Sequence, residues 1–361
     1  MGMVKKSTDE KRKDVLILIP YEGYFSRFSS RLEDYINEMK NVPIATVTTV
    51  IPPYYSCYSK TKKLLNKRQV VMVIFFNFFY FFYRFALRRR CKRDIILLAD
   101  NVVTIPLLFL VKILPFISAR KKIIAMSFFL HGIGGKKFIQ KILRFLLNDK
   151  KLLLIVQSKY EEEYYSQLMD RDRIIYFPFC QHEVSISEDC GKGEEYIFAG
   201  GYTNRDYECM FEAARNINHN FTIICSRLNQ ITGLNRKPDN IRLLRDTKPA
   251  DFHGYLKNSK IVVIPLKEKA GSSGQMVSLA AMLFKKPVIY TNIDSVSQYF
   301  EDGVSGISYE INNAEDLVSK MSYLLAKPEL RDKLGTNAYK AYYEKYHIIN
   351  YCGFLADLIL K

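Results

Sequence analysis

Short apolar segments alternate with helix-like segments along almost the whole chain, and this alternation limits the possible folds more than any other feature. The first apolar run, residues 15–20, ends at a proline and is typical of a buried parallel strand. An amphipathic segment at residues 26–40 and a second strand-like run at residues 43–50 follow it. A β-α-β opening of this kind predicts a doubly wound parallel sheet.

The alternation stops at a polar, glycine-containing break, residues 184–195, and then starts again. The chain of 361 residues also exceeds the ~250–300 residues that one hydrophobic core usually serves. We therefore predict an α/β chain with two Rossmann-like, doubly wound domains that face a central cleft. The predicted divisions are a polar leader (1–14), a first domain (15–183), a linker (184–195), a second domain (196–340) and a C-terminal helix (341–361) that packs back on the first domain.

The net charge of +17 is concentrated in the first half of the chain. Residues 41–150 contain 20 Lys and Arg but only 3 Asp and Glu, whereas residues 191–361 contain 22 and 19. An excess of this size predicts an anionic partner, and the charge alone leaves nucleic acid, an anionic membrane surface and a phosphorylated ligand open.

A phenylalanine-rich run, Val70 to Tyr83, lies inside this basic region. Its 14 residues are too few to span a ~30 Å hydrocarbon core as a helix. Two alternatives remain, a buried helix of the first domain or a helix in the plane of a membrane, with flanking Lys and Arg up to Arg93 facing anionic headgroups. The aromatic run and the lack of a recognition motif favour an anionic membrane surface, bound through Val70–Arg93, over nucleic acid. Because the leader is too polar for an export signal, we expect a cytoplasmic protein at the inner face of the cell membrane.

A second informative segment runs from Lys260 to Ser308. A strand ends at Pro265, a loop with Ser272, Ser273 and Gly274 follows, and a helix begins near Gln275. Free backbone N–H groups and the positive end of the helix would suit an anion, although an ordinary strand-loop-helix turn has the same pattern.

From here the sequence resembles a known family. The loop, the Ala280-Ala281-Met282 helix, the Lys286–Ile289 strand start, Gln298 and Asp302-Gly303 with Gly306 resemble the second domain of GT-B glycosyltransferases of family 4, the group 1 glycosyltransferases, of the bacterial polysaccharide-assembly type. The resemblance implies transfer of a sugar from a nucleotide-diphosphate donor to a lipid-linked or oligosaccharide acceptor, with no metal and no cofactor besides the nucleotide sugar. Together with the loop and strand-end residues, it leads us to expect these donor-binding residues: Gly200, Gly201, Asn204, Arg205, Ser226, Arg227, Ser272, Ser273, Gly274 and Gln275. For Ser226 and Arg227, which follow the strand-like run 221–226, a solvated pair is the alternative.

Three of these implications concern catalysis. Arg205 takes the place of the basic residue that holds the donor diphosphate, with a surface Arg beside the next helix as the alternative. His131 and Glu22 are alternative bases for an inverting reaction, or otherwise a structural His and a solvated Glu. Gly23 and Tyr24 belong to the acceptor-side loop.

Two further features concern the catalytic function and the binding of a metal. The family's two glutamates fall at Ser272 and Ala280, so a non-catalytic nucleotide- or carbohydrate-binding homologue is the alternative function. The Asp170-Arg171-Asp172 triplet has the spacing of a metal-binding DxD, but it follows a charged helix and is interpreted as a solvated helix end.

Overall fold

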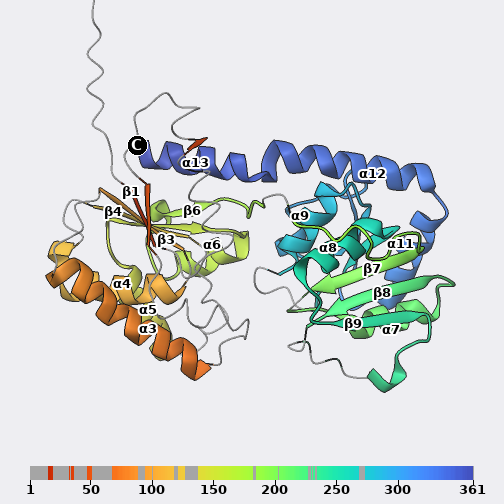
Figure 1. The fold of residues 1–361 in the computed structure, drawn as a ribbon, viewed down its shortest axis with the longest axis horizontal. Coiled ribbons are helices and arrows are strands. Elements are labelled where there is room, and N and C mark those ends of the chain that lie inside the picture. The colour runs from red at the N-terminus through yellow and green to blue at the C-terminus, as the bar shows by residue number, and fades with distance from the viewer. Residues whose placement is uncertain are drawn as a thin grey trace, which may run out of the picture. The chain divides into compact units, whose positions relative to one another are not determined.

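The computed structural model of the protein describes residues 15–18, 32, 34–35, 47–50, 67–87, 94–99, 101–117, 121–126, 137–181, 184–201, 203–226, 229, 231, 234–267 and 273–360. The chain forms two compact units (Figure 1). The first comprises Met1–Gln157, Glu161–Phe177 and Tyr351–Lys361, and the second comprises Ser158–Tyr160 and Pro178–Asn350.

The first unit contains a parallel sheet with the strand order β2-β1-β3-β4-β5-β6. Its strands are β1 (Val15–Leu18), β2 (Val47–Val50), β3 (Ile95–Ala99), β4 (Lys122–Met126), β5 (Leu152–Val156) and β6 (Ile174–Tyr176). Sequences such as IILLA and LLLIV are apolar throughout because helices cover both faces of a parallel sheet, so both sets of side chains are buried.

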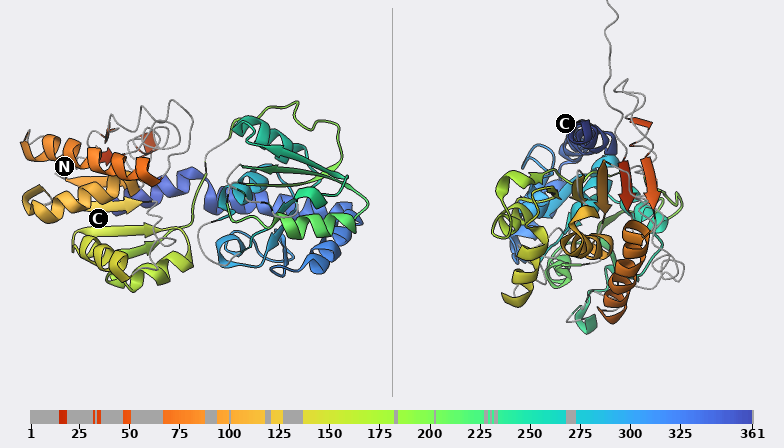
Figure 2. Two further views of the ribbon diagram at one scale, coloured as in Figure 1. Left: turned by 90° about the horizontal axis from the view of Figure 1, so that it is seen from below. Right: turned by 90° about the vertical axis from the view of Figure 1, so that its left-hand side faces the viewer.

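Three helices lie side by side in this unit, with α4 between α3 and α5 (Figures 1 and 2). They are α3 (Lys67–Phe81), which continues as a π-helix over Phe82–Leu87, α4 (Asn101–Ile113) with a 3-10 turn at Pro115–Ile117, and α5 (Lys137–Leu147). The predicted helix 26–40 lies largely outside the described residues.

The remaining helices of the first unit are α6 (Lys159–Ser166), a 3-10 turn at Arg171–Arg173, and the greater part of α13 (Ile348–Leu360). Lys122 Nζ donates to the carbonyl of Leu358 at 2.8 Å, and the rings of Phe177 and Phe354 stack with centroids 4.2 Å apart. The end of α13 is therefore part of the first unit. No helix within the described ranges is both long and apolar enough to cross a membrane.

The second unit contains a parallel sheet with the order β12-β11-β10-β7-β8-β9. Its strands are β7 (Tyr196–Gly201), β8 (Asn220–Cys225), β9 (Ile241–Arg245), β10 (Ile261–Ile264), β11 (Val288–Thr291) and β12 (Ile307–Tyr309). Its helices are α7 (Tyr207–Arg215), α8 (Pro249–Asn258), α9 (Gln275–Leu283), α10 (Asp294–Ser297), α11 (Ala314–Leu325) and α12 (Pro328–Ala341), with 3-10 and π turns at Leu234–Arg236 and Tyr342–Tyr346.

Alternate residues of these strands enter two cores on opposite faces of the sheet. Ile197 and Val263 pack in one core with α7 and α11, and Phe198 and Val262 pack in the other with α9. The two parallel sheets confirm the predicted doubly wound α/β architecture.

The polar segment 184–195, predicted as a linker, lies in the second unit. Ser187 N donates to the carbonyl of Ala250 at 3.0 Å, and the Ser187 hydroxyl donates to Asp251 Oδ1 at 2.6 Å. These bonds fasten the segment to the start of α8.

Candidate functional site

In the sheet of the second unit, the strand order reverses between the adjacent strands β7 and β10. The chain enters this sheet at β7, adds β8 and β9 on one side, and then adds β10, β11 and β12 on the other. The loops that follow the adjacent strands β7 and β10 therefore lead away in opposite directions. In open parallel sheets, ligands bind at the carboxyl ends of the strands at such a switch point.

Two glycines end β7, and both make room for a neighbouring side chain. A Cβ on Gly200 would lie 2.6 Å from the ring of Phe252. Gly201 has a φ of +140°, and a side chain there would collide with the guanidinium of Arg205. The Gly-Gly pair thus lets the arginine fold back against the end of its own strand.

Arg205 is buried, with 7% of its surface exposed. Its Nε donates to the carbonyl of Gly200 at 2.9 Å and its Nη1 to the carbonyl of Thr203 at 2.7 Å. Burial lowers the pKa of the guanidinium. Among the described residues, no carboxylate lies within ion-pair distance of it. A buried cation without a counter-ion is costly, so this position suits an anion supplied by a ligand.

The loop after β7 is tied to the loop after β10. Asp206 N donates to the carbonyl of Pro265 at 3.0 Å, and Lys267 N donates to the carbonyl of Asn204, which has a φ of 54°, at 3.3 Å. Between these bonds Arg205 and Leu266 form an antiparallel bridge. The backbone of residues 204–206 is therefore held directly against the end of β10.

Gly274 begins α9 on the other side of Leu266. Its φ is +89°, and a Cβ there would lie 2.6 Å from Val296 Cγ2 and 3.2 Å from Leu266 Cδ1. No side chain caps the start of α9. The positive end of this helix thus lies beside the same residue, Leu266, that pairs with Arg205.

The other predicted donor residues fall into two groups. Ser226 follows β8 beside Gly201, because Cys225 pairs with Gly201, and its N–H donates to Asn229 Oδ1 at 2.9 Å. Ser273 and Gln275 flank Gly274, and Gln275 is buried. Arg227, Ser272, Glu22, Gly23, Tyr24 and His131 lie outside the described residues.

Two residues that the sequence did not single out support this site. Thr291, the last residue of β11, accepts the Leu266 N–H through Oγ1 at 2.8 Å and is fully buried. Lys267 pairs with Glu208 in the first turn of α7. The sequence hints at Lys267 only by its position, two residues after the proline that follows a strand. No sequence pattern indicates a role for Thr291.

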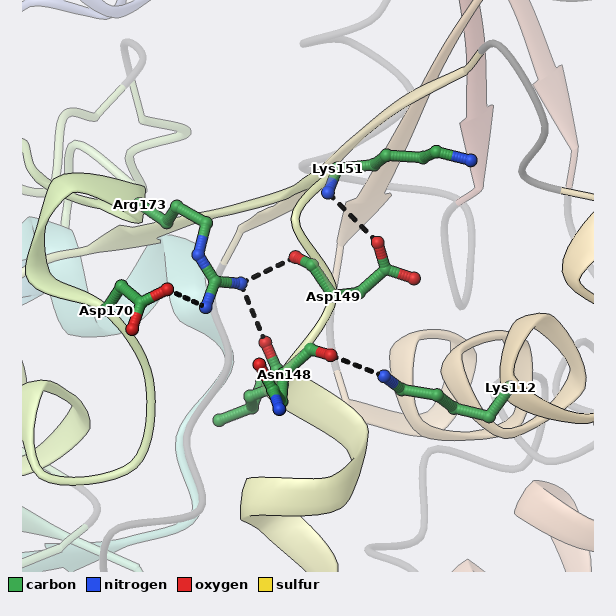
Figure 3. Close-up of polar contacts among 7 residues, drawn as sticks. Lys112, Asn148, Asp149, Lys151, Asp170 and Arg173 are labelled. Atoms are coloured by element: carbon green, nitrogen blue, oxygen red, sulfur yellow. Dashed lines mark hydrogen bonds and ion pairs between the residues drawn. The ribbon is translucent and has the colours of Figure 1, made fainter.

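The Asp170-Arg171-Asp172 triplet lies in the first unit. Asp170 Oδ2 accepts a hydrogen bond from Arg173 Nη2 at 2.9 Å (Figure 3). Within the described residues, no group of three or more His, Cys, Asp or Glu is arranged to hold a metal ion.

Comparison with known proteins finds a family model that matches part of the second unit. Residues 227–341 match the family model "Glycosyl transferases group 1". An uncharacterized glycosyltransferase of Methanocaldococcus jannaschii is 24% identical over 196 residues, which are 53% of this chain and 54% of that protein. The chain thus spans about half the length of the curated relative that it matches.

Two solved structures are similar over almost the whole chain. Sucrose-phosphate synthase from Thermosynechococcus elongatus has a TM-score of 0.66 at 12% identity, covering 96% of this chain and 99% of its own. HepE of Anabaena, solved with UDP and glucose, has a TM-score of 0.66 at 13% identity, with the same coverage. These similarities show the GT-B fold.

Proposed function

Residues 227–341 carry the sequence pattern of the group 1 glycosyltransferases within a GT-B fold, and we propose that the protein transfers a sugar from a nucleotide-diphosphate donor to an acceptor. The donor would bind to the second unit at the carboxyl ends of β7 and β10. The observation that carries this proposal is the buried Arg205, which is bonded to two backbone carbonyls and has no carboxylate partner within the described residues.

The chemistry follows from charge. Breaking the bond between the sugar and the diphosphate leaves negative charge on the phosphate, and fixed positive groups stabilise it best where water is excluded. Arg205 brings a guanidinium, which suits phosphate oxygens, and the uncapped start of α9 brings backbone N–H groups. We assign Gly200, Gly201, Asn204, Ser226 and Ser273 to the surrounding donor site and the first unit to the acceptor.

Stereochemistry decides whether an enzymic base is needed. An inverting reaction requires a group that takes the proton of the acceptor, and His131 or Glu22 is the base we propose for it. A retaining reaction needs no such base. Substitution of either residue would then have little effect on turnover.

One feature supports a second candidate function. Ala280 stands where the family has a glutamate, and it lies on the buried face of α9 with 1% exposure. Position 280 therefore offers no polar group to a ribose. A non-catalytic homologue that binds a nucleotide or carbohydrate would keep the diphosphate site and lack turnover.

The acceptor is proposed to be lipid-linked or an oligosaccharide of a surface polysaccharide, with the protein attached peripherally to the inner face of the membrane through Val70–Arg93. The net positive charge of residues 41–150 supports this attachment. So does the aromatic run of α3, which begins at Lys67.

The test is release of a nucleoside diphosphate. The protein is incubated with a panel of nucleotide sugars and membrane lipid acceptors, and the released UDP or GDP is measured. We expect release from at least one donor and a loss of at least ~100-fold in Arg205→Ala. Arg215→Ala, an exposed arginine of α7, is the matched control. Binding without release would favour the non-catalytic alternative, and absence of both would contradict both functions.

A further inference from the structure

The large exposed hydrophobic side chains among the described residues of the first unit lie on three neighbouring helices. Five of them, Val71, Met72, Phe75, Phe79 and Tyr83, lie on α3 and its π-helical continuation. The others described for this unit are Ile113 and Phe116 at the end of α4, and Phe138 and Phe145 on α5. The described strands of this unit, helix α6 and the part of α13 from Tyr351 onward add none.

Helix α3 has two distinct faces. Val73, Asn77 and Phe81, spaced four residues apart, are buried, and Asn77 Nδ2 donates to the carbonyl of Val102 in α4 at 2.8 Å. Phe75 and Phe79 repeat at the same spacing on the opposite, exposed face. The helix therefore completes the core with one face and leaves an aromatic ridge on the other.

Helix α5 also has one buried face and one exposed aromatic face, and its exposed face carries basic residues. Phe138 and Phe145, seven residues apart, are 73% and 55% exposed, and Lys141 and Arg144 are exposed beside them. Lys112 Nζ of α4 lies 5.5 Å from the centroid of the Phe145 ring. Two aromatic rings are thus presented among cations, while Leu143 and Leu146 on the other face enter the core.

The end of α5 is fixed to its surroundings (Figure 3). Arg173 Nη1 donates to the carbonyls of Leu147 and Asp149, and Lys112 Nζ donates to the carbonyl of Asn148 at 2.6 Å. The aromatic side chains of α5 are therefore carried by a helix anchored to the 3-10 turn Arg171–Arg173 and to α4.

The charge of this three-helix layer has one sign. Helix α3 with its continuation contains three Lys and Arg, α4 one and α5 three, and none of them contains Asp or Glu. A second copy of this face would bring like charges together. An anionic lipid surface matches both properties, because its headgroups attract the cations and its acyl boundary accepts the aromatic rings.

We propose that α3, the end of α4 and α5 form one membrane-docking face, and that α5 is a second element entering the lipid surface beside α3. This inference rests on the peripheral attachment given under the proposed function and extends it beyond Val70–Arg93. Phe138 and Phe145 enter the acyl boundary, and Lys137, Lys141 and Arg144 lie at the headgroups.

The test is co-sedimentation of the full chain with vesicles of phosphatidylglycerol and phosphatidylcholine in equal parts, without donor. The double variant Phe138→Ser/Phe145→Ser is expected to bind at least about tenfold more weakly than wild type. Lys141→Glu/Arg144→Glu should lose binding to a similar extent, and only on the anionic vesicles. Leu234→Ser and Tyr323→Ser, which replace exposed hydrophobic residues of the second unit, are the controls and should bind as wild type does.

Three outcomes would overturn the inference. Unchanged vesicle binding of both α5 double variants would show that α5 does not enter the lipid surface. Equal binding of the wild type to vesicles of pure phosphatidylcholine would show that the cations of this face do not contribute to docking. Light scattering that shows a wild-type dimer, abolished by Phe138→Ser/Phe145→Ser, would make a second copy the occupant. Diphosphate release without vesicles is measured in parallel, so failure of docking is distinguishable from failure of the proposed transfer.

Discussion

At the scale of single residues, Gly274 combines a left-handed backbone with a close neighbour. Its φ is +89°, and a Cβ there would lie 2.6 Å from Val296 Cγ2. We expect Gly274→Ala to lower the free energy of unfolding by about 2–4 kcal/mol, from backbone strain and overpacking together.

Gly303 is the matched control for this substitution. Its φ is +73°, and nothing lies within 4 Å of an added Cβ. Gly303→Ala should therefore cost only the backbone strain, about 1–2 kcal/mol. Urea unfolding followed by circular dichroism measures the stability of both variants. Equal losses of stability would show that the Val296 contact adds no cost to the Gly274 substitution.

Arg205 illustrates what a sequence can and cannot predict about a residue. Its place after a strand that ends in Gly-Gly was readable, because a glycine pair at the end of a strand indicates a tight turn. Its hydrogen bonds to Gly200 and Thr203 were not, because they depend on how the chain folds back after residue 201. The contact with Leu266 joins residues 61 positions apart, and local pattern does not reveal it.

At the scale of elements, the end of α5 depends on one buried arginine. The Arg173 side chain is 7% exposed and donates to two backbone carbonyls at the end of this helix. Arg173→Met should lower the free energy of unfolding by about 2–3 kcal/mol, because one buried and one partly buried carbonyl lose a charged donor.

The neighbouring arginine serves as the reference. The Arg171 side chain is 77% exposed and lies 3.6 Å from Glu162, so Arg171→Met should change stability by less than about 0.5 kcal/mol. The two variants are compared by thermal unfolding. Similar midpoints for both would mean that Arg173 does not hold the helix end.

The strands were more predictable than the helix faces. Runs such as YIFAGG and IVVI are apolar and short, each follows a charged residue, and they correspond to β7 and β10. The three-residue strands β6 and β12 contain no apolar run long enough to indicate them. From Val70 to Phe81, Asn77 is the one residue of α3 that is neither apolar nor aromatic, so the sequence does not reveal that Asn77 faces α4 and Phe79 faces outward.

At the scale of the whole molecule, the two units differ in charge and in the groups that they carry. The excess charge lies in residues of the first unit, where three helices without acidic residues form one layer. The second unit carries the Gly200–Arg205 turn and the uncapped start of α9 at the switch point of its sheet. The proposed membrane attachment therefore rests on the charge of the first unit, and the proposed donor site rests on a buried arginine of the second.

Calorimetric titration with a nucleoside diphosphate and with the matching nucleoside tests the proposed donor site most directly. If Arg205 and the start of α9 hold the diphosphate, UDP or GDP should bind one per chain, and uridine or guanosine at least about tenfold more weakly. Arg205→Lys should remove most of that difference, because an ammonium does not reproduce the guanidinium fork. Equal affinity for the nucleoside and its diphosphate, or an unchanged difference in Arg205→Lys, would contradict the proposed site.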